Sequence, residues 1–155
     1  MIRQMPEPCL KIRFSATESA VRPVLRQALH CLADRLSEED AGNLELALAE
    51  VLNNIVEHAY AGRSPGCVHL VVTRESAAVF CRVEDDGHPM PGLRLPEGAI
   101  APVADRIEDM AEGGWGWAMI RALTFDLDYQ RYTDHNSLSF RVPVANRSAG
   151  MVGSA

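Results

Sequence analysis

Residues 50–60 of the chain read EVLNNIVEHAY, and they close the amphipathic segment that decides the fold. From about Glu38 to Tyr60, apolar side chains recur every three or four residues, which predicts a helix with one buried face. Ser37 precedes the segment and is its predicted N-cap. The apolar face consists of Leu44, Leu48, Val51, Leu52, Ile55 and Ala59. The sequence therefore predicts one long helix with a single face toward the core.

A line of polar residues runs beside this apolar face. Glu50, Asn54 and His58 are spaced i, i+4 and i+8, and such residues project from one helix face in successive turns. Glu50 is a candidate general base toward a hydroxyl group. Asn54 offers a neutral oxygen of the kind that suits Mg²⁺. The plainer interpretation is a solvated helix face, with His58 packed or hydrogen-bonded at the helix end.

The segments around this helix predict strands and helices in an irregular order. Residues 9–14 alternate apolar and basic side chains, as in a half-buried strand, and the next segment predicts a helix capped by Ser19 with Pro23 in its first turn. The remaining predicted elements are strands at about 67–74, 77–85, 125–132 and 137–144 and a helix at about 117–123. This order favours an α+β fold with a mixed, mostly antiparallel sheet and helices on one face.

Two further motifs lie where predicted elements begin or end. Asp85, with Gly87 two residues later, ends a strand, and its ionised carboxylate accepts hydrogen bonds such as that of the adenine amine. Residues 113–116, GGWG, open a helix, and backbone N–H groups at a glycine-rich helix start bind phosphate. Each motif by itself also occurs in ordinary turns.

Composition and charge limit the class of protein. The chain has 155 residues, and we expect one domain with a core at about 9–144 and a flexible tail at 145–155. Lys and Arg number 15 against 21 Asp and Glu, a net charge of −6, and no basic cluster is present. Direct nucleic-acid binding is therefore disfavoured. The sequence contains no apolar run of transmembrane length and no signal-peptide pattern, so we expect a cytoplasmic protein without membrane attachment.

The cysteines give no sign of a metal site. The four are Cys9, Cys31, Cys67 and Cys81. No pair has the CxxC spacing that is typical of zinc ligands, and no pair is close to a histidine at a ligand spacing. We therefore expect free thiols in a reducing compartment.

Together, the three motifs resemble the nucleotide-binding motifs of the GHKL ATPase superfamily, which includes gyrase, Hsp90, histidine kinases and MutL. The pattern E-x3-N-x3-H-[AG]-Y at 50–60 is similar to that of the anti-sigma-factor serine/threonine kinases, and VEDDG at 83–87 and EGGWGWAMI at 112–120 resemble the two glycine-containing motifs that follow. The resemblance extends over nearly the whole chain. It implies the two-layer α/β sandwich of the superfamily.

The resemblance also implies a role for each motif residue. Glu50 would be the base that orients or deprotonates a substrate serine or threonine, and Asn54 would hold Mg²⁺ against the phosphates of ATP. Asp85 would bind the adenine amine, and Gly87 would leave room beside the ring. Residues 88–112 would form the ATP lid. The implied cofactor-binding residues are Asn54, His58, Asp85, Gly87, Gly113, Gly114 and Gly116.

The function implied by the resemblance is that of an ATP- and Mg²⁺-dependent serine/threonine protein kinase. Its partners would be a sigma factor, which it sequesters, and a STAS-domain anti-sigma antagonist, which it phosphorylates. Relatives are homodimers, so we expect a homodimer, with the first strand and helix as interface elements. One alternative is a nucleotide-binding module that sequesters its partner without turnover. Another is a detached sensor-kinase ATPase domain, although no histidine-bearing helix pair precedes residues 50–60.

Overall fold

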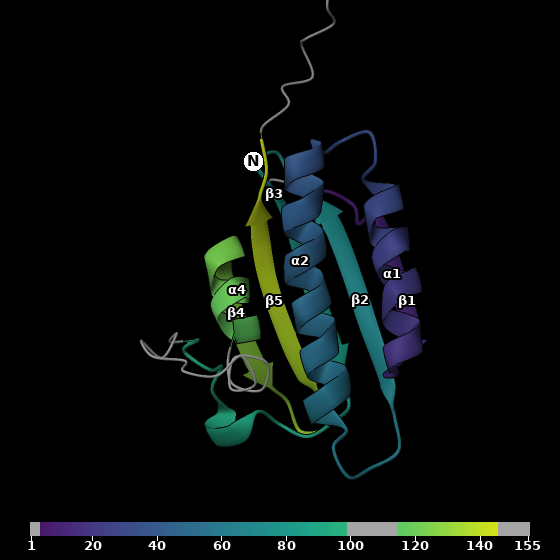
Figure 1. The fold of residues 1–155 in the computed structure, drawn as a ribbon, viewed down its shortest axis with the longest axis vertical. Coiled ribbons are helices and arrows are strands. Elements are labelled where there is room, and N and C mark those ends of the chain that lie inside the picture. Colours follow the sequence, from purple (N-terminus) through teal and green to yellow (C-terminus); the bar gives the residue numbers. More distant parts are fainter. Residues whose placement is uncertain (1–3, 99–114, 146–155) are drawn as a thin grey trace, which may run out of the picture.

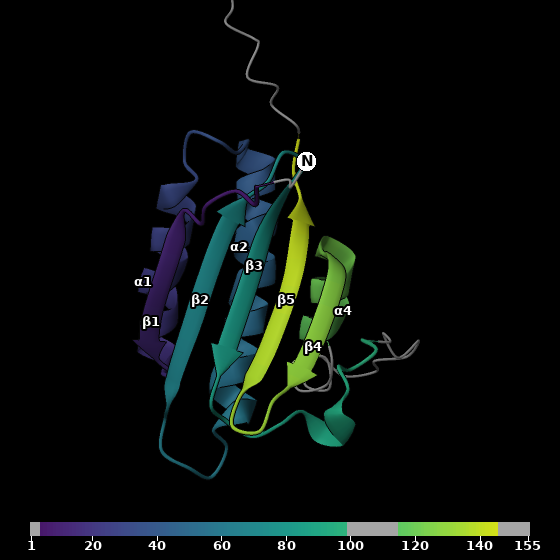
Figure 2. The ribbon, with the colours of Figure 1, turned by 180° about the vertical axis from the view of Figure 1, so that it is seen from behind.

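The computed structural model describes residues 4–98 and 115–145, and these form two layers. Three α-helices cover one face of a five-stranded sheet (Figure 1), and in the view from behind the strands lie in front of the helices (Figure 2). The elements are β1 (Leu10–Ser15), α1 (Glu18–Cys31), α2 (Glu38–Asn54), the π-helical turn η1 (Ile55–Ala59), β2 (Cys67–Arg74), β3 (Ala78–Asp85), the 3₁₀ turn η2 (Pro91–Leu93), α4 (Trp115–Leu123), β4 (Phe125–Arg131) and β5 (Asn136–Pro143). The predicted α+β class is confirmed.

The strand order is β1-β2-β3-β5-β4, and all four neighbouring pairs are antiparallel. The predicted mostly antiparallel sheet is therefore antiparallel in every described pair. β3 is the central strand, and its last residue, Asp85, lies opposite Asn136, the first residue of β5. This register sets the position of the candidate site, because it brings the end of one strand against the start of another.

The core lies between the sheet and α2. Alternate strand residues are fully buried against the helices, as the period of two in a one-sided sheet requires. They include Val68, Leu70, Val72, Val79, Cys81, Val83, Phe140 and Val142. From α2 and η1, the predicted apolar face supplies Leu44, Leu48, Val51, Leu52 and Ile55, all buried, and Ala59 is half-buried. The prediction of one core-facing stripe is confirmed.

The helix starts agree with the sequence at α2 and differ at α1. The Ser37 hydroxyl caps α2 and accepts a hydrogen bond of 3.1 Å from the backbone N–H of Asp40. The prediction that Ser19 caps α1 is wrong, because the N-cap is Thr17, whose backbone is extended, two residues earlier. Pro23 therefore lies beyond the first turn, where it removes one helical hydrogen bond.

Across residues 4–98 and 115–145, no helix combines the length and the apolar character that crossing a bilayer requires.

The core predicts the effect of a matched pair of substitutions on α2. Leu48 is 1% exposed and Leu46, two residues earlier, is 50% exposed. We expect Leu48→Ala to lower the free energy of unfolding by about 2–5 kcal/mol, because it leaves a cavity in the core. Leu46→Ala makes the same change of helix propensity at an exposed position. We expect it to change the free energy of unfolding by less than about 0.5 kcal/mol. Urea unfolding of the two variants measures the difference, and equal losses would contradict the described core.

Candidate active site

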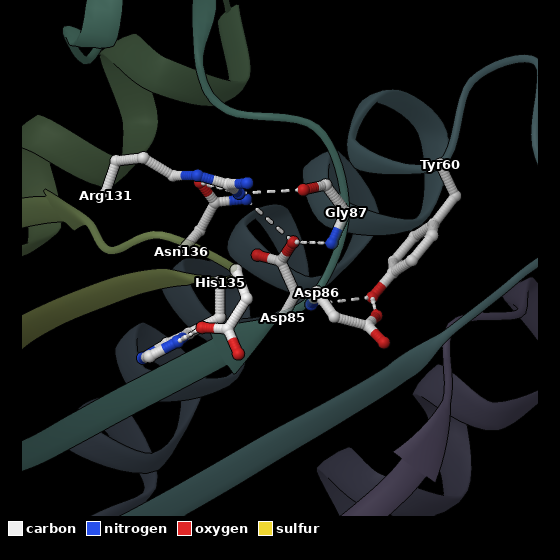
Figure 3. A network of polar contacts seen from close by, with 8 residues as sticks. Tyr60, Asp85, Asp86, Gly87, Arg131, His135 and Asn136 are labelled. Atoms are coloured by element: carbon white, nitrogen blue, oxygen red, sulfur yellow. Dashed lines mark hydrogen bonds and ion pairs between the residues drawn. The ribbon is translucent and has the colours of Figure 1, made fainter.

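Asp85 is a buried carboxylate at the end of the central strand. Its side chain is 6% exposed, and its Oδ1 accepts two hydrogen bonds of 2.9 Å, from the backbone N–H of Gly87 and from Nδ2 of Asn136 (Figure 3). Burial raises the pKa of the Asp85 carboxyl, and the two hydrogen bonds act in the opposite direction. Within the described part of the chain no donor reaches Oδ2, so this oxygen is available to a ligand.

Asn136 is itself fixed by groups from β4 and from the segment that follows β3. Its Oδ1 accepts hydrogen bonds from the Tyr129 hydroxyl at 2.6 Å and from Nη1 of Arg131 at 3.2 Å, and its Nδ2 also donates to the carbonyl of His88 at 2.8 Å. Arg131 donates a second bond, of 2.9 Å, to the Gly87 carbonyl. The sequence analysis did not predict the roles of Asn136, Tyr129 and Arg131. None of them belongs to a motif, so only knowledge of the strand register could have identified them.

Gly87 lies where the strand end and the helix end meet. A Cβ added to Gly87 would lie 2.7 Å from the Cβ of Ala59, closer than packed carbon atoms approach. The next residue, His88, donates its backbone N–H to the Ala59 carbonyl at 2.6 Å. Ala59 belongs to the π-helical turn η1, which replaces the last α-helical turn expected there. The glycine is therefore needed for close approach of two backbones.

Tyr60, the last residue of the 50–60 motif, ties this helix end to the strand. Its buried hydroxyl donates to the Asp86 carboxylate and accepts the Asp86 backbone N–H at 3.1 Å (Figure 3). The bond from Tyr60 holds the pKa of Asp86 below its ordinary value, while burial, together with the bond to Asp86, raises the pKa of Tyr60. Tyr60 thus fixes the backbone beside Asp85 without facing the ligand position.

The second group of motif residues meets where α4 begins. A Cβ added to Gly116 would lie 2.7 Å from Oε2 of Glu50 and 3.7 Å from Nδ2 of Asn54. The structure therefore brings together three predicted site residues from α2 and α4, and a side chain at position 116 would displace the Glu50 carboxylate. Glu50 and Asn54 are half-buried.

The side-chain amide of Asn54 lacks a hydrogen-bond partner among the described residues. Its Nδ2 is buried, and no described residue offers it a hydrogen-bond partner. Buried polar groups are normally paired, so an orphan beside Glu50 and Gly116 is unusual. Turning the amide by half a rotation would present Oδ1 instead. An oxygen ligand at this point fits Mg²⁺, which is commonly held by one or two protein groups together with phosphate oxygens and water.

The described residues supply no metal cage of their own. No group of three or more His, Cys, Asp or Glu side chains suited to a metal ion occurs within 4–98 and 115–145. A cation here would therefore depend on Asn54 and on the phosphates of a ligand. The binding of Mg²⁺ by Asn54 stays a prediction.

His58 does not contact these groups in the described structure. His58 is exposed, and its Nε2 lies 3.6 Å from Oε2 of Glu57, its neighbour in the chain. The π-helical turn intervenes between Asn54 and His58, so the i, i+4, i+8 line of an ideal α-helix does not continue. Gly113 and Gly114, with the predicted lid beyond residue 98, lie outside the described residues.

The described start of the predicted lid connects the two groups. After Asp85 the chain passes through η2 to Gly98, whose φ of +67° is a glycine conformation. A Cβ added to Gly98 would lie 2.7 Å from the backbone nitrogen of Ala118 in α4, and Nε of Arg121 donates to the Pro96 carbonyl at 2.9 Å. Residues 86–98 therefore run from the Asp85 carboxylate to the helix that carries Gly116.

Comparisons with known proteins identify the family to which this chain belongs. Residues 14–142 match the family described as histidine kinase-like ATPase domain. The serine/threonine-protein kinase BtrW of Bordetella bronchiseptica is 30% identical over 130 residues, which is 83% of this chain and 89% of the relative. The crystal structure of the RsbU and RsbW domains of a Mycobacterium tuberculosis protein matches with a TM-score of 0.55 and 21% identity, over 87% of this chain and 32% of that one.

The solved structure supports the fold alone, because its sequence identity is low, and this chain spans 32% of its length. The family match covers both groups of site residues described above, from α2 to β5. It agrees with the resemblance that the three motifs carry. The chain belongs to the histidine kinase-like ATPase domain family, and within it the chain is similar to a serine/threonine-protein kinase.

Proposed function

We propose that the protein is an ATP-dependent serine/threonine protein kinase that sequesters a sigma factor and phosphorylates a STAS-domain anti-sigma antagonist. The observation that carries the kinase proposal is the meeting of Glu50, Asn54 and Gly116 around one point, where an orphaned amide faces the start of a helix. Similarity to a serine/threonine-protein kinase supports the reaction class.

Asp85 is the proposed adenine-binding residue. Its Oδ1 is held by two donors, so the carboxylate cannot turn, and Oδ2 is left to accept the exocyclic amine of the base. Burial strengthens this bond, because water does not compete for the oxygen. Gly87 brings no side chain to the same place, and Arg131 holds its backbone by donating to the Gly87 carbonyl.

Glu50 is the proposed base for the substrate hydroxyl. Its carboxylate lies beside the start of α4, where helix N–H groups favour the negative charge of phosphate. Asn54 would hold Mg²⁺, which neutralises phosphate charge when bound. Glu50 would orient the hydroxyl and take its proton, and the absence of a side chain at Gly116 would allow the phosphate close to the backbone. His58, Gly113 and Gly114 keep the cofactor-binding roles implied by the motifs as proposals.

The proposed partners follow from the family resemblance. We propose a homodimer that uses β1 and α1, since β1 is the outer strand of the sheet and has one unpaired edge. A cytoplasmic location is part of the same proposal, because sigma factors act there. The charge of −6 favours action on protein partners over direct binding to nucleic acid.

The kinase proposal predicts a specific loss of transfer in Glu50→Gln. The variant keeps the shape of the side chain and loses the base, so we expect phosphorylation of a STAS-domain antagonist to fall by at least about 100-fold. Transfer of label from γ-labelled ATP to antagonist serine or threonine measures it. Glu45→Gln is the matched control, because Glu45 is an exposed residue on the same helix, and it should retain wild-type transfer.

The alternative of a sequestering module has a different outcome in this assay. Wild-type protein that binds ATP tightly, yet labels no antagonist encoded beside it, would overturn the kinase proposal and support the module. If the antagonist is labelled, and Glu50→Gln transfers as much label as Glu45→Gln, the kinase proposal stands. The proposed role of Glu50 as the base would then be rejected.

The adenine proposal predicts weaker nucleotide binding in Asp85→Asn. The donors from Gly87 and Asn136 would hold the amide oxygen, so the amide nitrogen would face the adenine amine, donor against donor. We expect ATP affinity to fall roughly 10- to 100-fold. Isothermal titration measures it. Asp128→Asn, an exposed change on β4, is the control. Unchanged affinity in Asp85→Asn would reject the adenine role.

Burial of Asp85 also predicts a pH dependence of stability. The folded-state pKa of Asp85 is raised above its ordinary 3.8, so the folded protein binds this proton more tightly than the unfolded chain. Wild-type protein therefore loses stability from this group as pH rises through that window, and Asp85→Asn does not. We expect the free energy of unfolding of Asp85→Asn minus that of wild type to increase from about pH 3.8 upward and then level off. Urea unfolding at several pH values measures it, and a decrease with pH would contradict the prediction.

A further inference from the structure

Two cysteines that are far apart in the sequence lie in contact at the other end of the sheet. Cys9 immediately precedes β1, and Cys31 is the last residue of α1. Their Sγ atoms are 2.7 Å apart, and both side chains are half-buried. The fold brings them together, because 22 positions separate them along the chain.

The backbone on both sides of this contact is fixed. Cys9 donates its N–H to the Val72 carbonyl at 2.8 Å, which extends the pairing of β1 with β2. The thiol of Cys31 donates to the Ala28 carbonyl at 3.1 Å within α1. Because an S–S bond is about 2.05 Å long, a small approach of the two sulfur atoms is enough to form one.

We propose that Cys9 and Cys31 are a redox-responsive thiol pair that forms an intramolecular disulfide by exchange with a small-molecule disulfide such as glutathione disulfide. One of the two cysteine sulfur atoms attacks one sulfur of the oxidant, forms a mixed disulfide and releases one reduced glutathione. The other cysteine sulfur then attacks the first, forms the protein disulfide and releases the second. The two protein thiols are oxidised, and the two hydrogens they lose are recovered on the two reduced glutathione molecules.

Burial, together with the neighbouring Cys9, raises the pKa of the Cys31 thiol to about 12. The exchange gives the same protein disulfide whichever of the two sulfur atoms attacks the oxidant first. Cys67 begins β2 at the Ser15 end of β1, away from Cys9. Cys81 is fully buried near the pair, and Cys9 and Cys31 both act on its pKa, so the peptide mapping below must also find Cys81 reduced.

The crosslink would restrain the first strand and the first helix of the fold. It closes a loop that contains β1 and α1, and closing a loop lowers the entropy of the unfolded chain. The start of β1 and the end of α1 lie at the upper end of Figure 2, and the end of β3, which carries Asp85, lies at the lower end. The crosslink should therefore stabilise the protein and leave nucleotide binding unchanged. This inference does not depend on the kinase proposal.

The test is oxidation of the full chain with glutathione disulfide. We expect the number of free thiols in the wild-type chain to fall from four to two on oxidation, with the remaining two unaffected. Non-reducing peptide mapping should join the Cys9 and Cys31 peptides. The melting temperature should rise by roughly 5 °C or more on oxidation and return with a reductant. ATP affinity, where the reduced protein binds ATP, should be equal in the two forms.

Three variants decide the outcome. Cys9→Ser and Cys31→Ser should show no rise in melting temperature with the oxidant, and Cys67→Ser should behave as wild type. If a serine variant folds poorly, peptide mapping of wild-type protein alone still decides. A stable glutathione adduct on Cys9, a disulfide between two chains through Cys67, or four thiols retained after oxidation would each overturn the proposal.

Discussion

The position of the candidate site depends on a buried carboxylate at the end of the central strand. A charge taken out of water is costly unless donors surround it, and Asp85 receives two. One donor is the backbone N–H of Gly87, which the tight turn at this residue directs toward the Asp85 carboxylate. The other is Asn136, whose amide is aligned by Tyr129 and Arg131. The ends of β3, β4 and β5 are therefore held in one arrangement by the need to satisfy a single side chain.

The glycines of the site act by what they leave out. At Gly87 the missing Cβ lets the strand end lie on the carbonyl of Ala59, and at Gly116 it lets α4 begin directly over Glu50. Neither residue has a positive φ, so the conformational freedom of glycine is not the reason for its presence. Close approach explains both positions, and it explains why motifs that are distant in the sequence meet at one end of the molecule.

The sequence predicted much of this, because periodicity and motif chemistry are local. The strands, α2 with its apolar stripe, and α4 follow from side chains a few residues apart, and they were found within a residue or two. The first helix was overextended, because its apolar spacing continues to Leu36 whereas α1 ends at Cys31. Asn136 was not found, because its role depends on lying opposite Asp85, and strand register is a property of the whole sheet. The π-helical turn at Ile55–Ala59 was missed for a related reason. Extrapolating an ideal α-helix through it placed His58 in line with Glu50, whereas the structure leaves His58 exposed beside Glu57.

The two ends of the molecule differ in how well their polar groups are satisfied. Near α4 and the end of β3, the fold keeps a buried amide at Asn54 that has no partner among the described residues, and a buried carboxylate at Asp85 whose pKa is raised by burial. Both oppose stability, and a hydrophobic core would not retain either. Proteins tolerate such groups where a ligand completes them, because binding then supplies the missing contacts. The opposite end, where Cys9 meets Cys31, contains no described orphan of this kind. The unsatisfied end is thus the end at which a ligand has most to contribute, and this is the physical reason for locating nucleotide chemistry there.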